Sequence, residues 1–328
     1  MTTRDAAPRY GEWEHQVPGA SPSPPSDPGT PPRPSGLRGS WPWGLARAVR
    51  PRQWVKNVLV LAAPLTSGRL LDPEVLFATS VAFGLFCLIS GAVYLLNDVV
   101  DFEEDRRHPR KRLRPIAAGI VPRPLALVVA VVLVVAAVVV AALTTRPELG
   151  WVLGVYVVLQ LGYCLWLKQQ PVIDLAIVAS GFLLRAVAGG VAAGIPLSQW
   201  FLLVAAFGSL FMVAGKRYSE LVVLGDQAAT RRTLREYSAS YLRFVWSMSA
   251  GVTVTVYGLW AFEMGESQEG VPWSTISIAP FVLGLLRHAV DLDRGAVGAP
   301  EEVVLRDRVL LVIGCVWLLT MGLGVSRG

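Results

Sequence analysis

Residues 125–143 read LALVVAVVLVVAAVVVAAL, which is nineteen apolar residues in a row. A helix needs roughly 20 such residues to cross the hydrocarbon core of a bilayer. The chain has 328 residues, of which 53% are hydrophobic and 16% are charged, whereas a soluble domain carries about 25% charged residues. Because similar apolar segments recur along the sequence, we expect an all-α, polytopic membrane protein.

Nine segments are expected to form membrane helices. They cover residues 51–67, 75–98, 122–144, 149–168, 171–193, 198–218, 240–262, 273–290 and 305–325. The first gives the weakest signal because it is short and contains Pro64. Residues 1–40 hold nine of the 23 prolines and few large apolar residues. We therefore expect a disordered, Pro-rich tail over 1–40 and a single transmembrane domain over 41–328.

The connections between these segments alternate in charge. Lys and Arg gather in residues 99–121 and 219–239, and the connection 291–304 holds Arg294, flanked by Arg287, Arg306 and Arg308. The alternate connections are nearly free of Lys and Arg. Since cytoplasmic loops of membrane proteins carry the excess of Lys and Arg, the tail and the basic connections are expected in the cytoplasm of a cell-membrane protein. These loops also account for the net charge of +6. No basic domain stands apart from the spans, so a nucleic-acid partner is not expected.

A cluster of acids follows the second segment, where residues 97–105 read NDVVDFEED. Helical spacing places Asn97, Asp101 and Asp105 on one face, with Asp98 beside them. Carboxylates stacked in this way repel one another, and a Mg²⁺ ion shared with substrate phosphates relieves that repulsion. These four residues are therefore the predicted catalytic and metal-binding group.

Six cations follow the acids between residues 106 and 114. Among them, Arg112 and Arg114 are predicted to face phosphate oxygens, because Arg pairs well with phosphate groups. The alternative is a solvated loop in which acids and cations neutralise each other. The register of the acids and their start within an apolar segment favour the metal–phosphate site.

Further polar residues lie on the same predicted side and are candidates for substrate binding. Each has a plainer interpretation. Residues around 50–57 would be interfacial anchors, and Lys168 would be a side chain that reaches for the interface. Asp174 with Arg185 would form an ion pair, and Lys216 would pair with Glu220 one helical turn away. Charged residues inside membrane segments more often line functional cavities. The candidates are Lys56, Tyr163, Lys168, Asp174, Arg185, Lys216, Arg217 and Glu220.

These motifs resemble the UbiA superfamily of membrane transferases over nearly the whole chain after residue 45. The N-D-x-x-D-x-x-x-D pattern at residues 97–105 is similar to the first acidic motif of that superfamily. The resemblance implies that this motif holds Mg²⁺ and a diphosphate. It also implies a nine-helix bundle around a polar cavity that faces the cytoplasm.

The chain departs from the superfamily pattern at the second acidic motif, where residues 216–220 read KRYSE. Together with RPRQWVKN at 50–57, KRLRPIAAG at 111–119 and GFLLR at 181–185, this resembles an actinobacterial branch. That branch moves phosphoribose from 5-phosphoribosyl-1-diphosphate to decaprenyl phosphate, for the arabinan of the cell wall. The extra cations suit a donor with phosphates at both ends, so we expect Lys216 and Arg217 to bind its 5-phosphate.

Two other functions stay open at this point. A prenyltransferase of the same superfamily would move a prenyl chain from a prenyl diphosphate to an aromatic or quinone precursor. A transporter would place its polar residues near the middle of the bilayer and often repeat its two halves, whereas these polar residues crowd one face. The lipid chain length and homo-oligomer formation are left undecided by the sequence.

Overall fold

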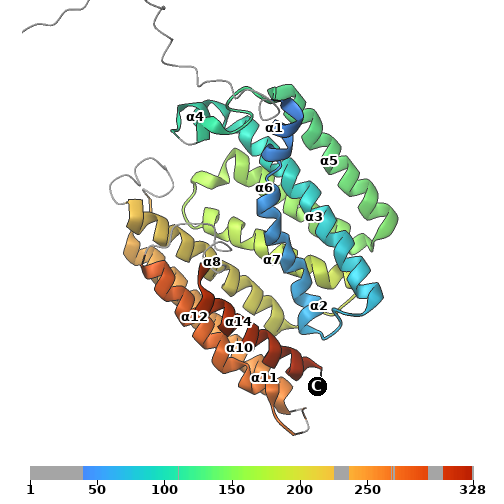
Figure 1. Cartoon of the computed structure of the whole chain (residues 1–328), viewed down its shortest axis with the longest axis vertical. Coiled ribbons are helices and arrows are strands. Elements are labelled where there is room, and N and C mark those ends of the chain that lie inside the picture. The colour runs from blue at the N-terminus through green and yellow to red at the C-terminus, as the bar shows by residue number, and fades with distance from the viewer. Residues whose placement is uncertain are drawn as a thin grey trace, which may run out of the picture. The chain divides into compact units, whose positions relative to one another are not determined.

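A computed structural model describes residues 40–109, 111–224, 236–266, 268, 270–294 and 306–326. Within these ranges every regular element is a helix (Figure 1). Eight helical segments are long and apolar enough to cross a membrane, so the predicted helical membrane protein is confirmed. They are α3 (Pro73–Val100), α5 (Arg123–Thr144), α6 (Pro147–Leu165), α7 (Ile173–Ala193), α8 (Gln199–Leu224), α10 (Ala239–Glu266), α11 (Trp273–Ile276) with α12 (Ile278–Asp293), and α14 (Arg308–Val325).

The ninth expected segment, residues 51–67, folds as two short helices. They are the 3₁₀ helix η2 (Pro51–Leu61) and the α-helix α2 (Ala62–Thr66). A 3₁₀ helix rises about 2 Å per residue, so η2 is about 22 Å long, and α2 adds about 7 Å. Their sum is close to the roughly 30 Å of a bilayer core, so these few residues are long enough to form a ninth crossing.

Short helices join the long ones at one end of the bundle. They are α1 (Trp41–Ala48), α4 (Phe102–Arg107), η3 (Lys111–Leu113) and η4 (Leu167–Gln169). Ala48 of α1 packs with Leu95 of α3 and Ile116 in a buried apolar cluster, which fixes α1 beside the end of α3. The tail predicted for residues 1–40 lies outside the described residues, apart from Ser40.

Two breaks in the helices have local causes. α3 ends at Val100, and α4 begins at Phe102. Asp101 between them has φ −84° and ψ 9°. The amides of Asp101 and Asp105 still donate to the carbonyls four residues earlier, so the helical register of the acids continues across the break. The predicted segment 273–290 is divided because Pro280 lacks an N–H group and clashes with the carbonyl four residues before it, which belongs to Ile276 at the end of α11.

α7 occupies the centre of the N-terminal half, where it packs against η2, α2, α3, α6 and α8. Its Gly189 lies so close to η2 that an added Cβ would stand 1.7 Å from the carbonyl oxygen of Val60. In the C-terminal half, α10 packs along α8 and α12 packs along α14. Residues Ser35–Gly328 form one compact unit.

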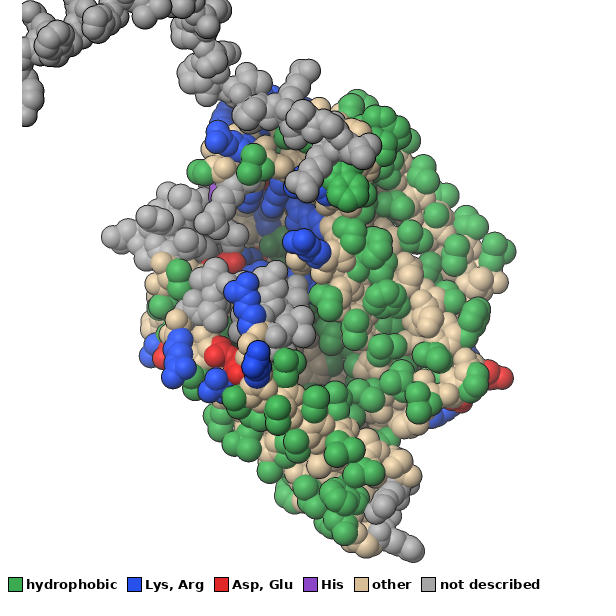
Figure 2. Space-filling view, viewed as in Figure 1, with side chains coloured by type: hydrophobic (Ala, Val, Ile, Leu, Met, Phe, Trp, Pro, Cys, Tyr) green, Lys and Arg blue, Asp and Glu red, His purple; other side chains and the backbone are tan. Residues whose placement is uncertain are grey.

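The outer faces of the helices are apolar. On α5, Val128, Val131 and Val135 each expose more than half of their surface, and Figure 2 shows hydrophobic side chains spread over this flank. Such a surface suits contact with lipid tails. Lys and Arg side chains instead gather near α1 and, in a second group, at the left ends of the C-terminal helices (Figure 2).

Candidate active site

We call the end of the bundle where α3 ends, α7 begins and α8 ends the site end. Two long-range ion pairs bring these helix ends together. Lys168 of η4 pairs with Asp101 at the end of α3, and Arg217 of α8 pairs with Asp174 in the first turn of α7, with 3.4 Å between nitrogen and oxygen. Residues predicted to act together, but far apart in sequence, are therefore neighbours.

Asp98 lies in the last turn of α3 and is 1% exposed. Its Oδ1 accepts a hydrogen bond of 2.5 Å from Nη2 of Arg50 and one of 3.1 Å from Nη1 of Arg114. A buried carboxylate requires such partners, because its water shell has been removed. Arg50 comes from the junction of α1 and η2, so three segments meet at this carboxylate.

Arg50 has an unusual backbone conformation. Its φ of 53° and ψ of 61° lie in the left-handed region, which costs an L-residue about 1–2 kcal/mol. The guanidinium stands 4.8 Å from the centre of the Tyr94 ring, in addition to its bond to Asp98. Strained residues of this kind cluster at binding and catalytic sites, so Arg50 belongs with the candidate site.

Asp105 is fully buried, with 0% exposure, in the short helix α4. Its Oδ2 accepts a 2.6 Å hydrogen bond from the same Nη1 of Arg114 that contacts Asp98. Its Oδ1 lies 3.6 Å from Nζ of Lys111 and has no hydrogen-bond partner. The guanidinium of Arg114 thus stands between two carboxylates, and one carboxylate oxygen keeps its acceptor capacity.

Asn97 and Asp101 complete the predicted group. The Asn97 amide donates a 3.2 Å hydrogen bond to Oδ2 of Asp101, while Oδ1 of Asp101 pairs with Lys168. Three acids therefore face the four cations Arg50, Lys111, Arg114 and Lys168. A cluster with this balance attracts an anion.

The carboxylates of Asp98 and Asp105 could also bind a divalent cation. Asp98 and Asp105 both reach one point, the Nη1 atom of Arg114, at 3.1 and 2.6 Å. Mg²⁺ is usually bound by one or two carboxylates together with substrate phosphates, and the oxygen of Asp105 that lacks a partner is suited to such a role. Over the part of the chain that the structure describes, no group of three or more Asp, Glu, His or Cys forms a metal cage. The arrangement therefore suits an ion that is completed by phosphate.

A second polar network surrounds Asp174, which is also 0% exposed. Its Oδ1 accepts a short hydrogen bond from the hydroxyl of Tyr237, and that hydroxyl accepts a 2.6 Å bond from the amide of Val172. Burial, and then the bond to Asp174, raise the pKa of Tyr237. The phenol therefore stays protonated and continues to donate to Asp174.

The residues that replace a second acidic motif form a loose group on α8. Nζ of Lys216 is 3.9 Å from Oε1 of Glu220, and Nη1 of Arg217 is 3.7 Å from its Oε2. Tyr163 of α6 also lies beside Arg217. The side chain of Lys216 is 40% exposed, so its ammonium is accessible for a phosphate. Ion pairs of this length and exposure are weak.

The sequence of the chain matches the UbiA prenyltransferase family over residues 58–306. The chain belongs to this family. It is 53% identical over 290 residues to a decaprenyl-phosphate phosphoribosyltransferase of Mycobacterium tuberculosis, covering 87% of this chain and 95% of that one. It is 50% identical over 287 residues to the enzyme of the same name from Corynebacterium glutamicum, covering 86% of each chain.

Solved UbiA structures share the fold. A UbiA homologue from Archaeoglobus fulgidus bound to DMAPP and Mg²⁺ superposes with a TM-score of 0.64 at 13% identity, covering 87% of this chain and 98% of that one. A structure of digeranylgeranylglyceryl phosphate synthase gives a TM-score of 0.63 at 16% identity, covering 88% of this chain and 99% of that one. The UbiA fold expected from the sequence is therefore confirmed.

Not every candidate residue of this UbiA protein joins the site in the same way. Arg112 lies in η3 with an exposed side chain, and Lys56 lies in η2 with a half-buried one. Tyr237 was missed by sequence reasoning, since no motif surrounds it. Arg50 and Lys111 stand inside the quoted motifs, but only the fold shows which acids they contact. The substrate-binding roles of all these residues stay predictions.

Arg185 of α7 is enclosed by protein groups. It is 6% exposed, and its three nitrogens donate to Asn57, to the carbonyl of Gly181, and to Ser90 and Tyr156. The alternative of an ion pair with Asp174 is wrong, because Asp174 pairs with Arg217. Arg185 thus ties η2, α3 and α6 to α7.

We expect Arg185→Met to lower the free energy of unfolding in detergent by about 2 kcal/mol, because it leaves buried acceptors such as Asn57 Oδ1 without a donor. Arg185→Lys keeps the charge, but the lysine cannot reach all the partners. Its free energy of unfolding should therefore lie between those of the wild type and Arg185→Met. Unfolding by a graded denaturant measures both variants. If Arg185→Met unfolds like the wild type and weakens only donor binding, Arg185 is a substrate ligand as the sequence predicted.

Proposed function

We propose that the chain transfers 5-phosphoribose from 5-phosphoribosyl-1-diphosphate to a polyprenyl phosphate such as decaprenyl phosphate, and releases diphosphate. The observation that carries this proposal is the 50–53% identity to decaprenyl-phosphate phosphoribosyltransferases over 86–87% of the chain. The local chemistry agrees. Both substrates and the product diphosphate are anionic, and the site places four cations around three acids.

We infer that the donor diphosphate binds at Asp98, Asp105 and the cations around them. When bound there by Asp98 and Asp105, Mg²⁺ would neutralise part of the charge on the leaving diphosphate. Arg50, Lys111 and Arg114 are positioned to donate to its oxygens, and such charge-assisted hydrogen bonds strengthen as charge accumulates. Asp101 holds Lys168 in place, with Asn97 supporting Asp101.

The transfer itself needs little proton chemistry. An oxygen of the lipid phosphate forms a bond to C1 of the ribose, while the bond from C1 to the diphosphate oxygen breaks and its electron pair leaves with the diphosphate. The nucleophile is already an anion, so no general base is required, and attack from the opposite face inverts C1. Lys216 and Arg217 are assigned to the 5-phosphate, with Glu220 and Tyr163 holding Arg217.

The orientation of the protein follows from its charges. The Lys- and Arg-rich connection 99–121 lies at the site end, and such connections stay in the cytoplasm. We therefore place the site at the cytoplasmic face of the cell membrane, where a water-soluble sugar phosphate has access. The product would enter synthesis of cell-wall arabinan.

Purified protein supplied with labelled 5-phosphoribosyl-1-diphosphate and a polyprenyl phosphate tests the proposal. Label should move into the lipid, stop when a chelator is added, and resume with added Mg²⁺. A parallel reaction with a prenyl diphosphate and hydroxybenzoate should give no product. Transfer in the second reaction alone would make the chain an aromatic prenyltransferase.

Lys216→Ala is expected to raise KM for the sugar donor about tenfold, because it removes a charged donor to phosphate. KM for the lipid phosphate should be unchanged, and Lys216→Arg should restore donor binding. Initial rates with each substrate varied in turn measure the two values. A change in KM for the lipid alone would show that Lys216 does not bind the 5-phosphate of the sugar donor.

A further inference from the structure

A groove runs along the membrane-facing side of the protein between α7 and α10, with α8 as its floor. Its volume is about 340 Å³, within the usual range for a small-molecule site. The lining is almost wholly apolar and includes Ala176 and Ala179 of α7, Phe207 and Leu210 of α8, and Phe244 and Met248 of α10. The small side chains of α7 create the space, because larger ones at this spacing would fill it.

The groove has the length of part of a lipid chain. Its lining extends from Val172, the residue before α7, to Leu183 of α7, and eleven residues of helix rise about 16 Å. That distance is about half of the roughly 30 Å hydrocarbon core. An apolar chain could therefore enter at the site end and reach the middle of the bilayer.

The mouth of the groove is joined to the polar site. Val172 at the mouth donates its amide to Tyr237, which in turn donates to Asp174, the partner of Arg217. Tyr241, which lines the groove, stacks on Tyr237 with 5.7 Å between ring centres. Hydrocarbon and phosphate ligands would thus meet within one continuous region.

Val172 itself is strained. Its φ of 68° and ψ of −47°, with a hydrogen bond from the amide of Ile173 to the carbonyl of Pro171, make a γ-turn of the rare positive-φ kind. Positive φ is a clear outlier for a β-branched residue. Such strain persists at ligand sites where the surrounding structure imposes it, and here the Tyr237 hydroxyl holds the turn.

The cation closest to the mouth in sequence is Lys168 of η4. Lys168, which contacts Asp101, is four residues before Val172, so their Cα atoms lie within about 14 Å. A lipid phosphate at the mouth could therefore reach Lys168 and face the diphosphate region around the acids.

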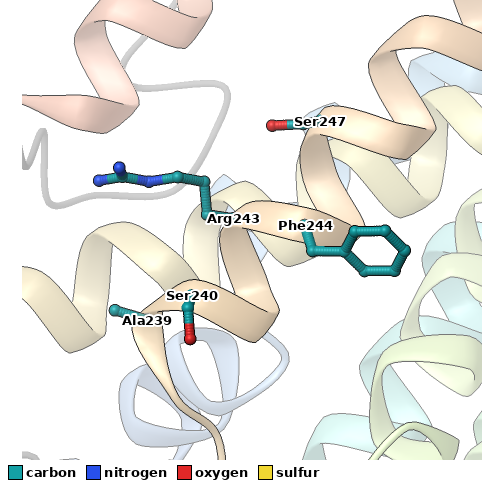
Figure 3. A pocket seen from close by; sticks show the side chains of 5 residues that line it. All are labelled: Ala239, Ser240, Arg243, Phe244 and Ser247. Carbon is teal, nitrogen blue, oxygen red and sulfur yellow. The ribbon is translucent and has the colours of Figure 1, made fainter.

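A neighbouring depression is lined, among the described residues, by α10 alone. It lies along α10, where Ser240, Arg243 and Ser247 line it together with Phe244 (Figure 3). Phe244 points away from Arg243 in Figure 3 and lines both hollows, so it separates them. Arg243 already contacts Tyr218 and Asp293.

From these observations we infer that the groove between α7, α8 and α10 binds the first isoprene units of the polyprenyl phosphate, with its phosphate at the mouth beside Lys168. This inference rests on the proposed function for the identity of the lipid. A single groove suits a lipid with one chain, whereas a phospholipid would leave its second chain without a groove.

Photolabelling tests the site without requiring turnover. A polyprenyl phosphate that carries a diazirine in its first isoprene units is irradiated with the full-length protein in detergent, and the labelled peptides are mapped by mass spectrometry. Label should fall on α7, α8 and α10, and an excess of unlabelled polyprenyl phosphate should remove it, whereas phosphatidylglycerol should not. Label on other helices, equal competition by phosphatidylglycerol, or links between two copies of the chain would overturn the inference.

A pair of variants then tests the role of the groove in transfer. Ala176→Phe fills the groove, and Ala142→Phe places the same ring on the exposed face of α5. With a long acceptor, Ala176→Phe should raise KM about tenfold, the equivalent of about two buried methylene groups. KM for a two-isoprene acceptor should rise as well, because that acceptor contains the units that enter the groove, whereas KM for the sugar donor should change much less, and Ala142→Phe should change none of the three.

The failures of the two proposals are distinguishable. If Ala176→Phe keeps the wild-type KM for the lipid acceptors while the wild type transfers phosphoribose, the groove assignment is wrong and the proposed function stands. If the wild type transfers no phosphoribose to either acceptor, the proposed function fails, and the photolabelling result still decides whether the groove binds a polyprenyl phosphate.

Discussion

Asp105→Asn is expected to reduce kcat about a thousandfold, the size of effect seen when a group that stabilises transition-state charge is removed. The wild-type carboxylate is fully buried and accepts from Arg114 at 2.6 Å. Its second oxygen has no hydrogen-bond partner, so it is available to a cation that arrives with the diphosphate. An amide has no negative charge, so it would hold neither Arg114 nor a divalent ion well. Single-turnover transfer of labelled phosphoribose measures the loss.

The neighbouring residue supplies a matched control. Glu104 belongs to the same helix α4 and has an exposed side chain, so Glu104→Gln removes the same charge without touching the Arg114 contact. We expect this variant to keep wild-type kcat. Size-exclusion profiles of both variants check that the bundle is intact. Equal kcat values for Asp105→Asn and Glu104→Gln would remove Asp105 from the reaction.

Much of the fold could be predicted, because long apolar segments of the sequence form the membrane helices. Residues 125–143 alone identify α5, and the other long segments follow the same rule. The ends of α8 and α10 extend beyond the predicted 218 and 262, to Leu224 and Glu266. Helical hydrogen bonds continue outside a membrane, whereas a hydropathy pattern ends at its surface. The 3₁₀ geometry of η2 likewise leaves no mark in composition.

The candidate site was predictable in part. The spacing of Asn97, Asp101 and Asp105 indicated one shared face, and the hydrogen bonds across Asp101 keep that register. Which cation contacts which acid depends on packing between distant segments, as with Arg50 and Asp98, 48 residues apart. The enclosure of Arg185 likewise depends on Asn57 of η2, which is 128 residues away. Sequence spacing carries no information on such pairs.

Arg114→Gln is expected to separate metal binding from substrate binding. The wild-type guanidinium places one nitrogen 3.1 Å from Asp98 and 2.6 Å from Asp105, so it competes with a divalent cation for both carboxylates. Without that charge, and in the absence of 5-phosphoribosyl-1-diphosphate, the two carboxylates should bind Mn²⁺ about tenfold more tightly than in the wild type. The size follows because an adjacent cation changes the proton affinity of a carboxylate by about tenfold or more. KM for 5-phosphoribosyl-1-diphosphate should rise about tenfold, because a charged donor to its phosphates is lost.

The opposite directions of these two effects make the test specific. A variant that only loosens the fold would weaken Mn²⁺ and donor binding together, whereas loss of a competing cation strengthens one and weakens the other. Titration of Mn²⁺ by electron paramagnetic resonance, without substrate, gives the first quantity independently of turnover. Arg107→Gln removes an exposed cation of α4 and should change neither. Weaker Mn²⁺ binding by Arg114→Gln would mean that the guanidinium organises the carboxylates for the ion, so that its positive charge does not compete with the metal.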